Sequence, residues 1–348
     1  MEIERPDLSQ VVPSVRVYIE ALEAEIEQLK GGRSKAESSQ PSVPLLPDEP
    51  PTTFNLITIS ESGTGKRTPR HLYSRQRRAG MGVFDLDTGD KEIPRVLAIA
   101  DENQNLLLFT DLARVFRLPV QALPEAPVHS RGLVVTGRFG LQEGEKLVSA
   151  LPDMAKGSVV MVSERGMVRS LRHHVFGEYM KPGTSLFDAK QFGKLRAVCW
   201  TPGDGDLFIA TRQGRAIRFS EKLVPPQGGP GIKVEAGDAA VAVAPVYPDS
   251  GVFLLASDGR GTIRSMEGFN PNKSAGGSGK LAMSTDDLVG AVTVEQDEDI
   301  FIISRLSKLI RFMAAEVPVK DGVVQGVNCM SLRADETIAL VTSKPAAR

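Results

Sequence analysis

Residues 207–218 read LFIATRQGRAIR, and this stretch decides the fold because the chain repeats it. Four apolar residues lead to Thr211, a short polar turn with Gly214 follows, and a second run ends at Arg218. This pattern is typical of a β-hairpin with a tight turn. It recurs in five other segments, which are 55–67, 106–117, 159–169, 252–264 and 300–311.

The spacing of these hairpins predicts how they assemble. A Ser or Thr enters each turn and recurs every 46–53 residues, at Ser60, Thr110, Ser163, Thr211, Ser257 and Ser304. A hairpin alone leaves its apolar face in water, so hairpins with this period pack around a common axis. A further apolar strand follows each hairpin, which is compatible with four strands per unit. We predict an all-β, six-bladed β-propeller over residues 52–344.

The first 51 residues have a different pattern. Residues 1–32 form an amphipathic helical segment with a short heptad stripe of apolar residues, at Val15, Ile19, Leu22, Ile26 and Leu29. About two heptads are marginal for a lone helix, so the segment docks on the propeller, on a second copy or on another protein, or it stays disordered. Residues 33–51 are rich in Pro, Ser and acidic side chains, which is typical of a flexible linker.

Composition narrows the classes of protein. The chain has no long apolar run and its N-terminus is acidic and polar, so we expect neither a membrane span nor a signal peptide. Cys199 and Cys329 are the only cysteines, too few for a disulfide framework or a four-ligand zinc site, and we expect a cytoplasmic protein. With four histidines we find no convincing catalytic set, and we expect no enzyme activity, no cofactor and no metal.

The formal net charge of −1 hides an uneven distribution. Residues 1–50 hold five basic and ten acidic side chains, whereas residues 51–348 hold 37 basic and 33 acidic ones. The predicted propeller is therefore mildly basic. Binding of a polyanion depends on the local field and not on the total charge, so the net charge does not exclude nucleic acid.

Two features of the propeller are candidates for that binding. The densest basic stretch runs from Lys66 to Arg78, and a loop of this composition either holds phosphates or is a solvated charged loop. The second feature is an Arg near the end of each hairpin, predicted at equivalent places: Arg67, Arg117, Arg169, Arg218, Arg264 and Arg311. With Lys66, these arginines form a candidate DNA-binding rim, unless each merely pairs with an acid at a blade junction.

One run of residues resembles a known motif. Residues 76–82 read QRRAGMG, which resembles the box of the DNA gyrase A C-terminal domain, usually QRRGGKG. Residues 114–126, 217–238 and 309–336 are similar to blades of that domain, so the resemblance covers roughly residues 52–344. It implies a six-bladed β-pinwheel, a propeller variant whose blades exchange strands, that wraps double-stranded DNA around its basic perimeter.

The resemblance also implies which box residues contact DNA. They are Arg75, Gln76, Arg77, Arg78, Gly80 and Gly82. Ala79 and Met81 depart from the usual box, so one phosphate-binding cation is missing, and Arg75 is the candidate to compensate. The chain has no room for the breakage-reunion domain that precedes the pinwheel in gyrase, and the resemblance therefore implies a non-catalytic module.

Two functional hypotheses follow. The first is a DNA-bending or DNA-wrapping protein without base specificity, associated with the nucleoid, that modulates DNA topology with a topoisomerase. The alternative is an interaction scaffold or gyrase-associated factor that has lost wrapping, which Met81 and the near-neutral charge favour. In either case the partner is double-stranded DNA, a type II topoisomerase subunit or a second copy bound through residues 15–29.

Overall fold

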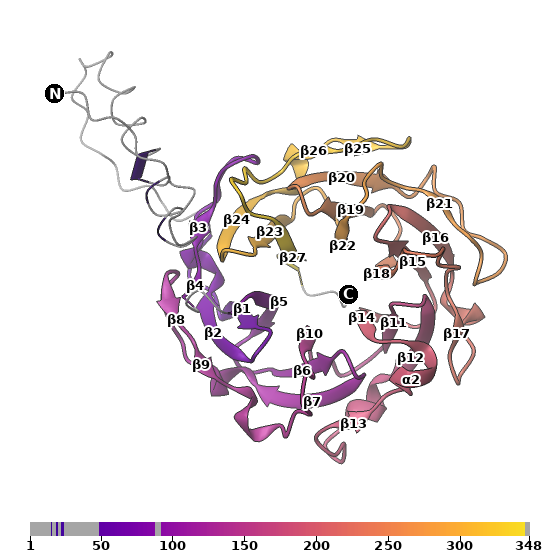
Figure 1. Cartoon of the computed structure of the whole chain (residues 1–348), viewed down its shortest axis with the longest axis horizontal. Helices are drawn as coiled ribbons and strands as arrows, with labels where there is room; N and C mark the ends of the chain where they lie inside the picture. Colours follow the sequence, from indigo (N-terminus) through magenta and orange to yellow (C-terminus); the bar gives the residue numbers. More distant parts are fainter. Residues whose placement is uncertain (1–14, 16–18, 20–21, 24–48, 88–91, 345–348) are drawn as a thin grey trace. The chain divides into compact units, whose positions relative to one another are not determined.

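The computed structural model describes residues 15, 19, 22–23, 49–87 and 92–344. From residue 49 onward these residues form a ring of six sheets around a central opening (Figure 1). We number the sheets blades 1 to 6 in chain order. The predicted all-β, six-bladed propeller is therefore confirmed.

Each blade has its strands ordered from the centre of the ring outward. In that order, blade 1 contains β5 (Pro94–Asp101), β1 (Phe54–Ser60), β2 (Thr64–Pro69) and β9 (Leu133–Val134). Blade 2 contains β10 (Leu147–Pro152), β6 (Asn105–Thr110), β7 (Arg114–Pro119) and β13 (Thr184–Ser185). Blade 3 contains β14 (Leu195–Thr201), β11 (Ser158–Ser163), β12 (Met167–Arg172) and β17 (Gly229–Pro230).

The second half of the ring repeats this order. Blade 4 contains β18 (Ala240–Val246), β15 (Asp206–Thr211), β16 (Arg215–Ser220) and β21 (Lys280–Leu281). Blade 5 contains β22 (Leu288–Val294), β19 (Gly251–Ala256) and β20 (Arg260–Ser265), and both β25 (Val319–Lys320) and β26 (Val327–Asn328) pair with β20. Blade 6 contains β27 (Thr337–Thr342), β23 (Asp299–Ser304), β24 (Lys308–Met313) and β3 (Val83–Phe84).

Short elements complete the described chain. A two-stranded parallel pair joins β4 (Leu86–Asp87) to β8 (Ser130–Arg131). One turn of α-helix is α2 (Ala189–Phe192). The 3-10 turns are η2 (Arg70–Leu72), η3 (Val120–Ala122), η4 (Thr136–Arg138), η5 (His173–Phe176), η6 (Glu221–Leu223) and η7 (Ala314–Glu316).

The outermost strand of each blade comes from elsewhere in the chain. β9 of blade 1 follows β7 of blade 2 in the sequence, and β13 of blade 2 follows β12 of blade 3. Blade 6 receives β3, which lies near the start of the propeller. Each blade is thus bound to the next one by a donated strand, and the ring closes between blade 6 and blade 1.

The core lies between blades. Six clusters of buried apolar residues each join two adjacent blades, and the last of them packs Leu56 and Ile99 of blade 1 against Phe301 and Leu309 of blade 6. The middle strands are buried on both faces, as in β23, in which all six residues are buried. This explains why the middle strands read as continuous apolar runs and not as alternating ones.

The N-terminal predictions are largely untested. Val15, Ile19, Leu22 and Glu23 adopt helical conformation, but the rest of the 1–32 segment and the 33–48 part of the linker lie outside the described residues. The boundaries of these segments therefore stay predictions. Within the part of the chain that the structure describes, no helix is long and apolar enough to cross a bilayer.

Candidate nucleic-acid interface

The box segment, residues 75–82, lies where the ring closes. It runs from η2, which follows β2 of blade 1, into β3, which pairs with β24 of blade 6. The backbone N–H of Gln76 donates to the carbonyl of Arg311 at 2.7 Å, and that of Ala79 donates to the carbonyl of Cys329 at 2.8 Å. The box therefore ties the beginning of the propeller to its last blade.

The two glycines of the box have structural roles. Gly82 has a φ of +73°, and a Cβ there would lie 2.7 Å from the carbonyl oxygen of Leu309, so no other residue lets β3 approach β24 so closely. The N–H of Gly82 donates to Oε1 of Gln76 at 3.2 Å, and the N–H of Gly80 donates to the carbonyl of Arg77 at 3.2 Å. Both amides are thus satisfied inside the box. A glycine precedes the donated strand in the other blades too, at Gly132, Gly183, Gly228, Gly279 and Gly326.

The box side chains differ in their availability. The guanidinium of Arg75 forms two hydrogen bonds with the carboxylate of Asp299, at 2.8 and 3.2 Å. The guanidinium of Arg78 donates to the carbonyl of Asn328 at 3.1 Å, and its backbone N–H donates to the Glu316 carboxylate at 3.0 Å. Arg77 is exposed, and within the described residues its guanidinium takes part in no hydrogen bond or ion pair. Among the box cations, Arg77 is therefore the one whose side chain is available to bind an external anion.

Lys66 lies in the interior and not on the rim. Its side chain is 0% exposed, and Nζ lies 2.9 Å from the carboxylate of Asp85. Nζ also donates to the carbonyls of Pro127 and Val128, at 2.8 and 2.6 Å. Burial lowers the pKa of Lys66, and the Asp85 carboxylate acts in the opposite direction. The ammonium holds β4 and β8 against blade 1 and is out of reach of a surface phosphate.

Hairpin register shows which of the repeated arginines are equivalent. Arg67, Arg117, Arg218 and Arg311 all occupy the third Cα pair counted from the turn. Arg169 occupies the second pair and Arg264 the fourth. Because side chains alternate between the two faces of a strand, these two point to the opposite face from the other four. The prediction that all six arginines are equivalent is therefore wrong for two of them.

The four equivalent arginines act as clamps between blades. Each donates to a backbone carbonyl in the segment that follows the second hairpin strand of the next blade, which is β7, β12, β20 or β2. The acceptors are Leu123 for Arg67 at 3.3 Å, Phe176 for Arg117, Met266 for Arg218 at 2.8 Å, and Tyr73 for Arg311 at 3.0 Å. The clamp of Arg311 crosses the closure of the ring, because Tyr73 belongs to the segment after blade 1.

Each clamp also has an acidic partner. The ion pairs are Arg67–Glu125 at 2.7 Å, Arg117–Asp153 at 2.7 Å, Arg218–Asp206 at 2.8 Å and Arg311–Asp299 at 2.6 Å. The alternative that the repeated arginines pair with acids is therefore right for four of the six, but the acid comes from the neighbouring blade only for Arg67. The other three acids lie on or directly after a strand of the arginine's own blade. Arg169 instead donates to the carbonyl of Leu186. The repeated arginines thus mainly fasten neighbouring blades to each other.

Comparisons with known proteins agree with this architecture. A family model described as "DNA gyrase C-terminal domain, beta-propeller" matches residues 55–92, 104–152 and 205–246. A solved structure of a DNA gyrase A C-terminal domain superposes with a TM-score of 0.71 at 17% identity, over 83% of this chain and 99% of that one. The C-terminal domain of a DNA topoisomerase IV superposes with a TM-score of 0.60 at 18% identity, over 84% and 94%.

The body of the chain has the β-propeller fold of DNA gyrase A C-terminal domains. The DNA gyrase A protein of Mycobacterium leprae is 27% identical over 300 residues, which are 82% of this chain and 24% of that protein. That of Staphylococcus epidermidis is 25% identical over 354 residues, which are 96% and 40%. This chain therefore spans a quarter to two fifths of the length of these relatives. The resemblance predicted from the box is confirmed.

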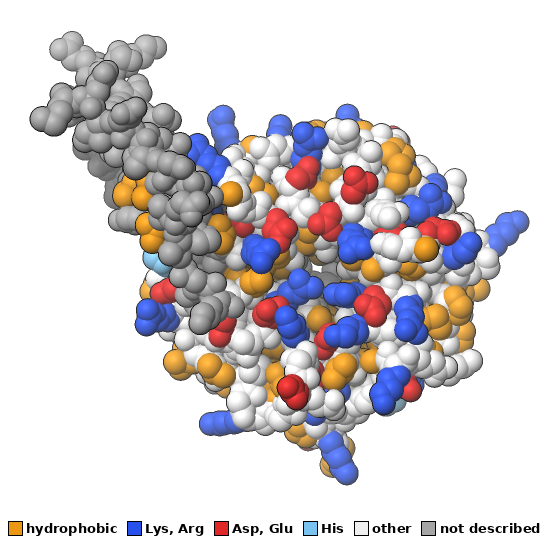
Figure 2. Space-filling view, viewed as in Figure 1, with side chains coloured by type: hydrophobic (Ala, Val, Ile, Leu, Met, Phe, Trp, Pro, Cys, Tyr) orange, Lys and Arg blue, Asp and Glu red, His pale blue; other side chains and the backbone are white. Residues whose placement is uncertain are grey.

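The gyrase-type propeller presents a wider set of surface cations, of which our sequence prediction named only those of the box as candidate DNA contacts. They lie in the outer segments. Each outer segment runs from the end of the second hairpin strand of one blade (β2, β7, β12, β16, β20 or β24) to the strand donated to its neighbour. Apart from Arg75, which pairs with Asp299, the exposed ones are Arg77, Arg131, Arg172, Lys181, Lys222, Lys273 and Lys320. Figure 2 shows Lys and Arg side chains projecting from several sides of the ring. In the sequence these cations follow the second strand of each predicted hairpin. The donated strands that end the outer segments have only two residues each, which is too short to recognise from sequence.

Most of these perimeter cations have no acidic partner. Arg131 pairs with Asp87 at 3.2 Å, yet its side chain is 86% exposed. Within the described residues, the other six side chains take part in no hydrogen bond or ion pair. Every one of the six outer segments thus presents at least one exposed cation, and together they form a discontinuous ring of positive charge.

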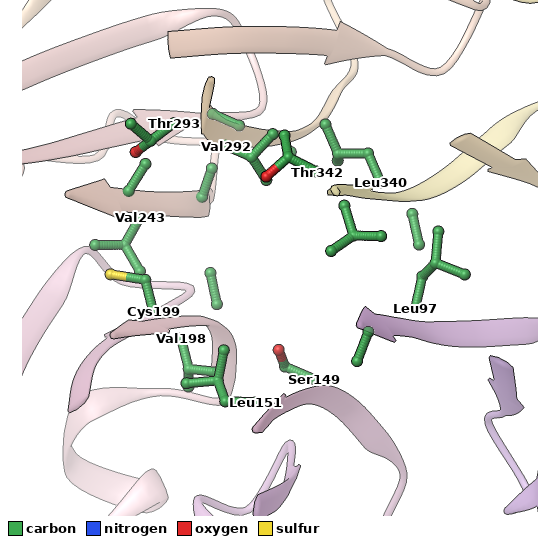
Figure 3. A pocket seen from close by; sticks show the side chains of 18 of the residues that line it. Leu97, Ser149, Leu151, Val198, Cys199, Val243, Val292, Thr293, Leu340 and Thr342 are labelled. Carbon is green, nitrogen blue, oxygen red and sulfur yellow. The ribbon is translucent and has the colours of Figure 1, made fainter. Parts of the chain in front are cut away.

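The central opening is lined differently from the perimeter. Figure 3 shows the side chains of Leu97, Val198, Val243 and Leu340 around this opening, on four different inner strands. Its wall is thus mainly apolar, and Glu298 lies at its edge with a pKa raised by burial to about 7. Among the described residues, no group of three or more His, Cys, Asp or Glu is placed to hold a metal ion.

Proposed function

We propose that this gyrase-type propeller binds double-stranded DNA around its perimeter, without base specificity, and bends or wraps it. The observation that carries the proposal is the exposed cation in every outer segment. Cations spaced around a convex edge match the phosphates of a duplex that curves along that edge. Neutralising each phosphate releases counterions, which favours binding whatever the base sequence.

The number of cations matters because bending DNA costs energy. Smoothly bending 20–30 bp by 40–90° costs about 1–6 kcal/mol, so a single contact does not hold a wrapped duplex. A chain of contacts from blade to blade offsets this cost step by step. The four clamps and the box take a supporting part, since they keep the blades at fixed spacing and present Arg77 at the closure.

In this proposal the protein is a binding module and not an enzyme. It changes the path of the DNA, and a type II topoisomerase performs any strand passage. The family match and the similarity to DNA gyrase A proteins support this assignment. The box residues Gln76, Gly80 and Gly82 then contribute by closing the ring, whereas Arg77 contributes a phosphate contact.

The test combines binding with DNA topology. Affinity for a duplex is measured against salt concentration, and log K should fall linearly with log salt, with a slope near −0.9 for each phosphate neutralised. Relaxed circular DNA is then treated with a nicking-closing enzyme in the presence of the protein, and a change in linking number is expected. Lys156 lies in the turn between β10 and β11, outside the outer segments, so Lys156→Gln is the matched control for perimeter variants.

Two outcomes would contradict the proposal in different ways. Binding with an unchanged linking number would rule out wrapping but keep DNA binding. A flat binding curve at low salt would rule out both. If a protein partner is then captured and lost on deletion of residues 1–32, the interaction-scaffold alternative replaces the proposal.

A further inference from the structure

Arg264 differs from the other repeated arginines in its surroundings. It lies on β20 of blade 5, one residue beyond the clamp position, and its side chain is turned to the opposite face. The residue is 5% exposed. Ile263 occupies the clamp position in its place, so blade 5 has no arginine clamp of the kind seen in blades 1, 2, 4 and 6.

The guanidinium of Arg264 is buried without a partner. Its Nε and Nη1 atoms are inaccessible to solvent and make no hydrogen bond. Within the described residues no carboxylate oxygen comes within 4 Å of it. Its closest favourable contact is with the ring of Phe269, whose centroid lies 5.6 Å from Cζ. A buried cation with so few contacts is energetically costly, because it loses its hydration and gains few hydrogen bonds or ion pairs in exchange.

Two other cations lie beside Arg264. Nζ of Lys280, on the strand donated to blade 4, stands 4.2 Å from the centroid of the same Phe269 ring. Lys320, on β25, is the Cα partner of Arg264 and is exposed. Cross-strand partners share a face of the sheet, so like charges gather at this place from two donated strands and an outer strand.

The charges around Arg264 are unfavourably arranged when no anion is bound. Burial lowers the pKa of Arg264, and Asp321 opposes that effect from beyond ion-pair distance. Burial also lowers the pKa of Lys280, and the nearby Arg264 lowers it further. Arg264 and Lys280 thus repel each other while Arg264 is desolvated, a cost that a bound anion would relieve.

We propose that Arg264, Lys280 and Lys320 form a phosphate-binding site at the perimeter, where blade 5 meets the strand it donates to blade 4. Nη2 of Arg264 and Nζ of Lys280 would donate to the phosphate oxygens, and Lys320 would close the site from solvent. Arg–phosphate contacts are among the stronger charge-assisted hydrogen bonds. In the complex with DNA the group is a backbone phosphate, a step that rests on the proposed function; a free phosphate ion has the same chemistry.

Arg264→Met is the decisive variant because it separates binding from stability. If Arg264 exists to bind an anion, replacing it with an apolar side chain should raise the midpoint of thermal unfolding and weaken phosphate binding. Arg218→Met, which breaks a paired clamp, should lower the midpoint. Lys273→Gln removes one exposed charge from the segment that follows β20 and is the matched control for binding of inorganic phosphate.

Two probes distinguish the sources of phosphate. Inorganic phosphate is titrated into the protein while the side-chain NMR signals of Arg264 and Lys280 are followed, and saturable shifts are expected that Arg264→Met abolishes and Lys273→Gln preserves. For duplex DNA, Lys280→Gln should make the salt slope shallower by about 1. Arg264→Met should weaken DNA binding at least threefold more than Lys156→Gln, which lies outside the outer segments.

Each result has a defined meaning. If phosphate binds at Arg264 but neither the wild type nor any variant binds DNA, the phosphate site stands and the proposed function fails. If wild type binds DNA and Arg264→Met binds it equally well, the site is overturned as a DNA contact while the proposed function stands. If Arg264→Met unfolds at a lower temperature and phosphate shifts neither signal, Arg264 is a structural residue and the proposal is wrong.

Discussion

The ammonium of Lys66 lies 2.9 Å from the carboxylate of Asp85, and neither side chain is exposed to solvent. The hydroxyls of Thr58 and Tyr73 each donate to the same carboxylate at 2.6 Å. Every group of this buried network has a partner. A residue that the sequence places in the densest basic stretch thus holds together the blade that closes the ring.

Lys66→Met should destabilise the propeller by about 3–5 kcal/mol, because it leaves the Asp85 carboxylate buried and unpaired. Asp85→Leu should have a similar effect. The double variant should recover part of the loss, since no charge remains uncompensated. Urea unfolding at neutral pH measures all three. A loss below about 1 kcal/mol for Lys66→Met would show that the ammonium is not structurally required.

The clamps should be graded by burial. Arg311 is 2% exposed and bonds to Asp299, Glu49 and the carbonyl of Tyr73, so Arg311→Met should cost about 3–5 kcal/mol. Arg117 is a quarter exposed, and Arg117→Met should cost roughly 1–2 kcal/mol. Chemical denaturation ranks the two. Equal costs would contradict the idea that burial decides the strength of a clamp.

Ala79 has a φ of +66°, in a region that favours glycine. Ala79→Gly should therefore stabilise the protein by about 0.5–1 kcal/mol, because relief of left-handed strain exceeds the entropy cost of glycine. Gly82→Ala should destabilise it by more than about 1 kcal/mol, since its Cβ would strike the carbonyl of Leu309. Thermal unfolding of the pair gives opposite signs if the box conformation is as described.

Glu298 should make stability depend on pH. Burial raises its pKa from 4.5 to about 7, while Lys344 acts in the opposite direction. A raised carboxyl pKa contributes stability that is full below pH 4.5 and is lost as pH rises through 7, by about 3 kcal/mol in total. Glu298→Gln should match the wild type near pH 4 and be more stable near pH 8. If Glu298→Gln and the wild type differ in stability by the same amount at both pH values, this explanation is wrong.

Arg77 should account for the DNA contact of the box. Arg77→Gln should make the salt slope of DNA binding shallower by about 1 and leave stability within about 0.5 kcal/mol of wild type, because its guanidinium is exposed and unengaged among the described residues. Lys156→Gln is the control outside the outer segments. If both variants bind DNA alike at every salt concentration, Arg77 is not a phosphate contact. A large loss of stability in Arg77→Gln would instead assign it to the closure.

The sequence by itself determined the six-bladed ring. Each hairpin carries its own local signal, which is an apolar run, a polar turn and a second run, and the period of the repeat requires a common axis. The box at residues 76–82 was likewise recognisable, because its identity lies in adjacent residues. The clustered charge of residues 66–78 was visible as well, but not which of its side chains meets solvent.

Only the tertiary structure decided which cations are available. Lys66 and Arg77 lie in the same basic stretch, yet one is sealed in the core and the other is exposed. A shift of one residue in register turned Arg264 away from the clamp that Arg218 makes, and no local pattern reports such a shift. The physical reason is that a charge is engaged or free according to partners far away in the chain, such as Asp85 for Lys66 or Tyr73 for Arg311, which only the closed ring brings together.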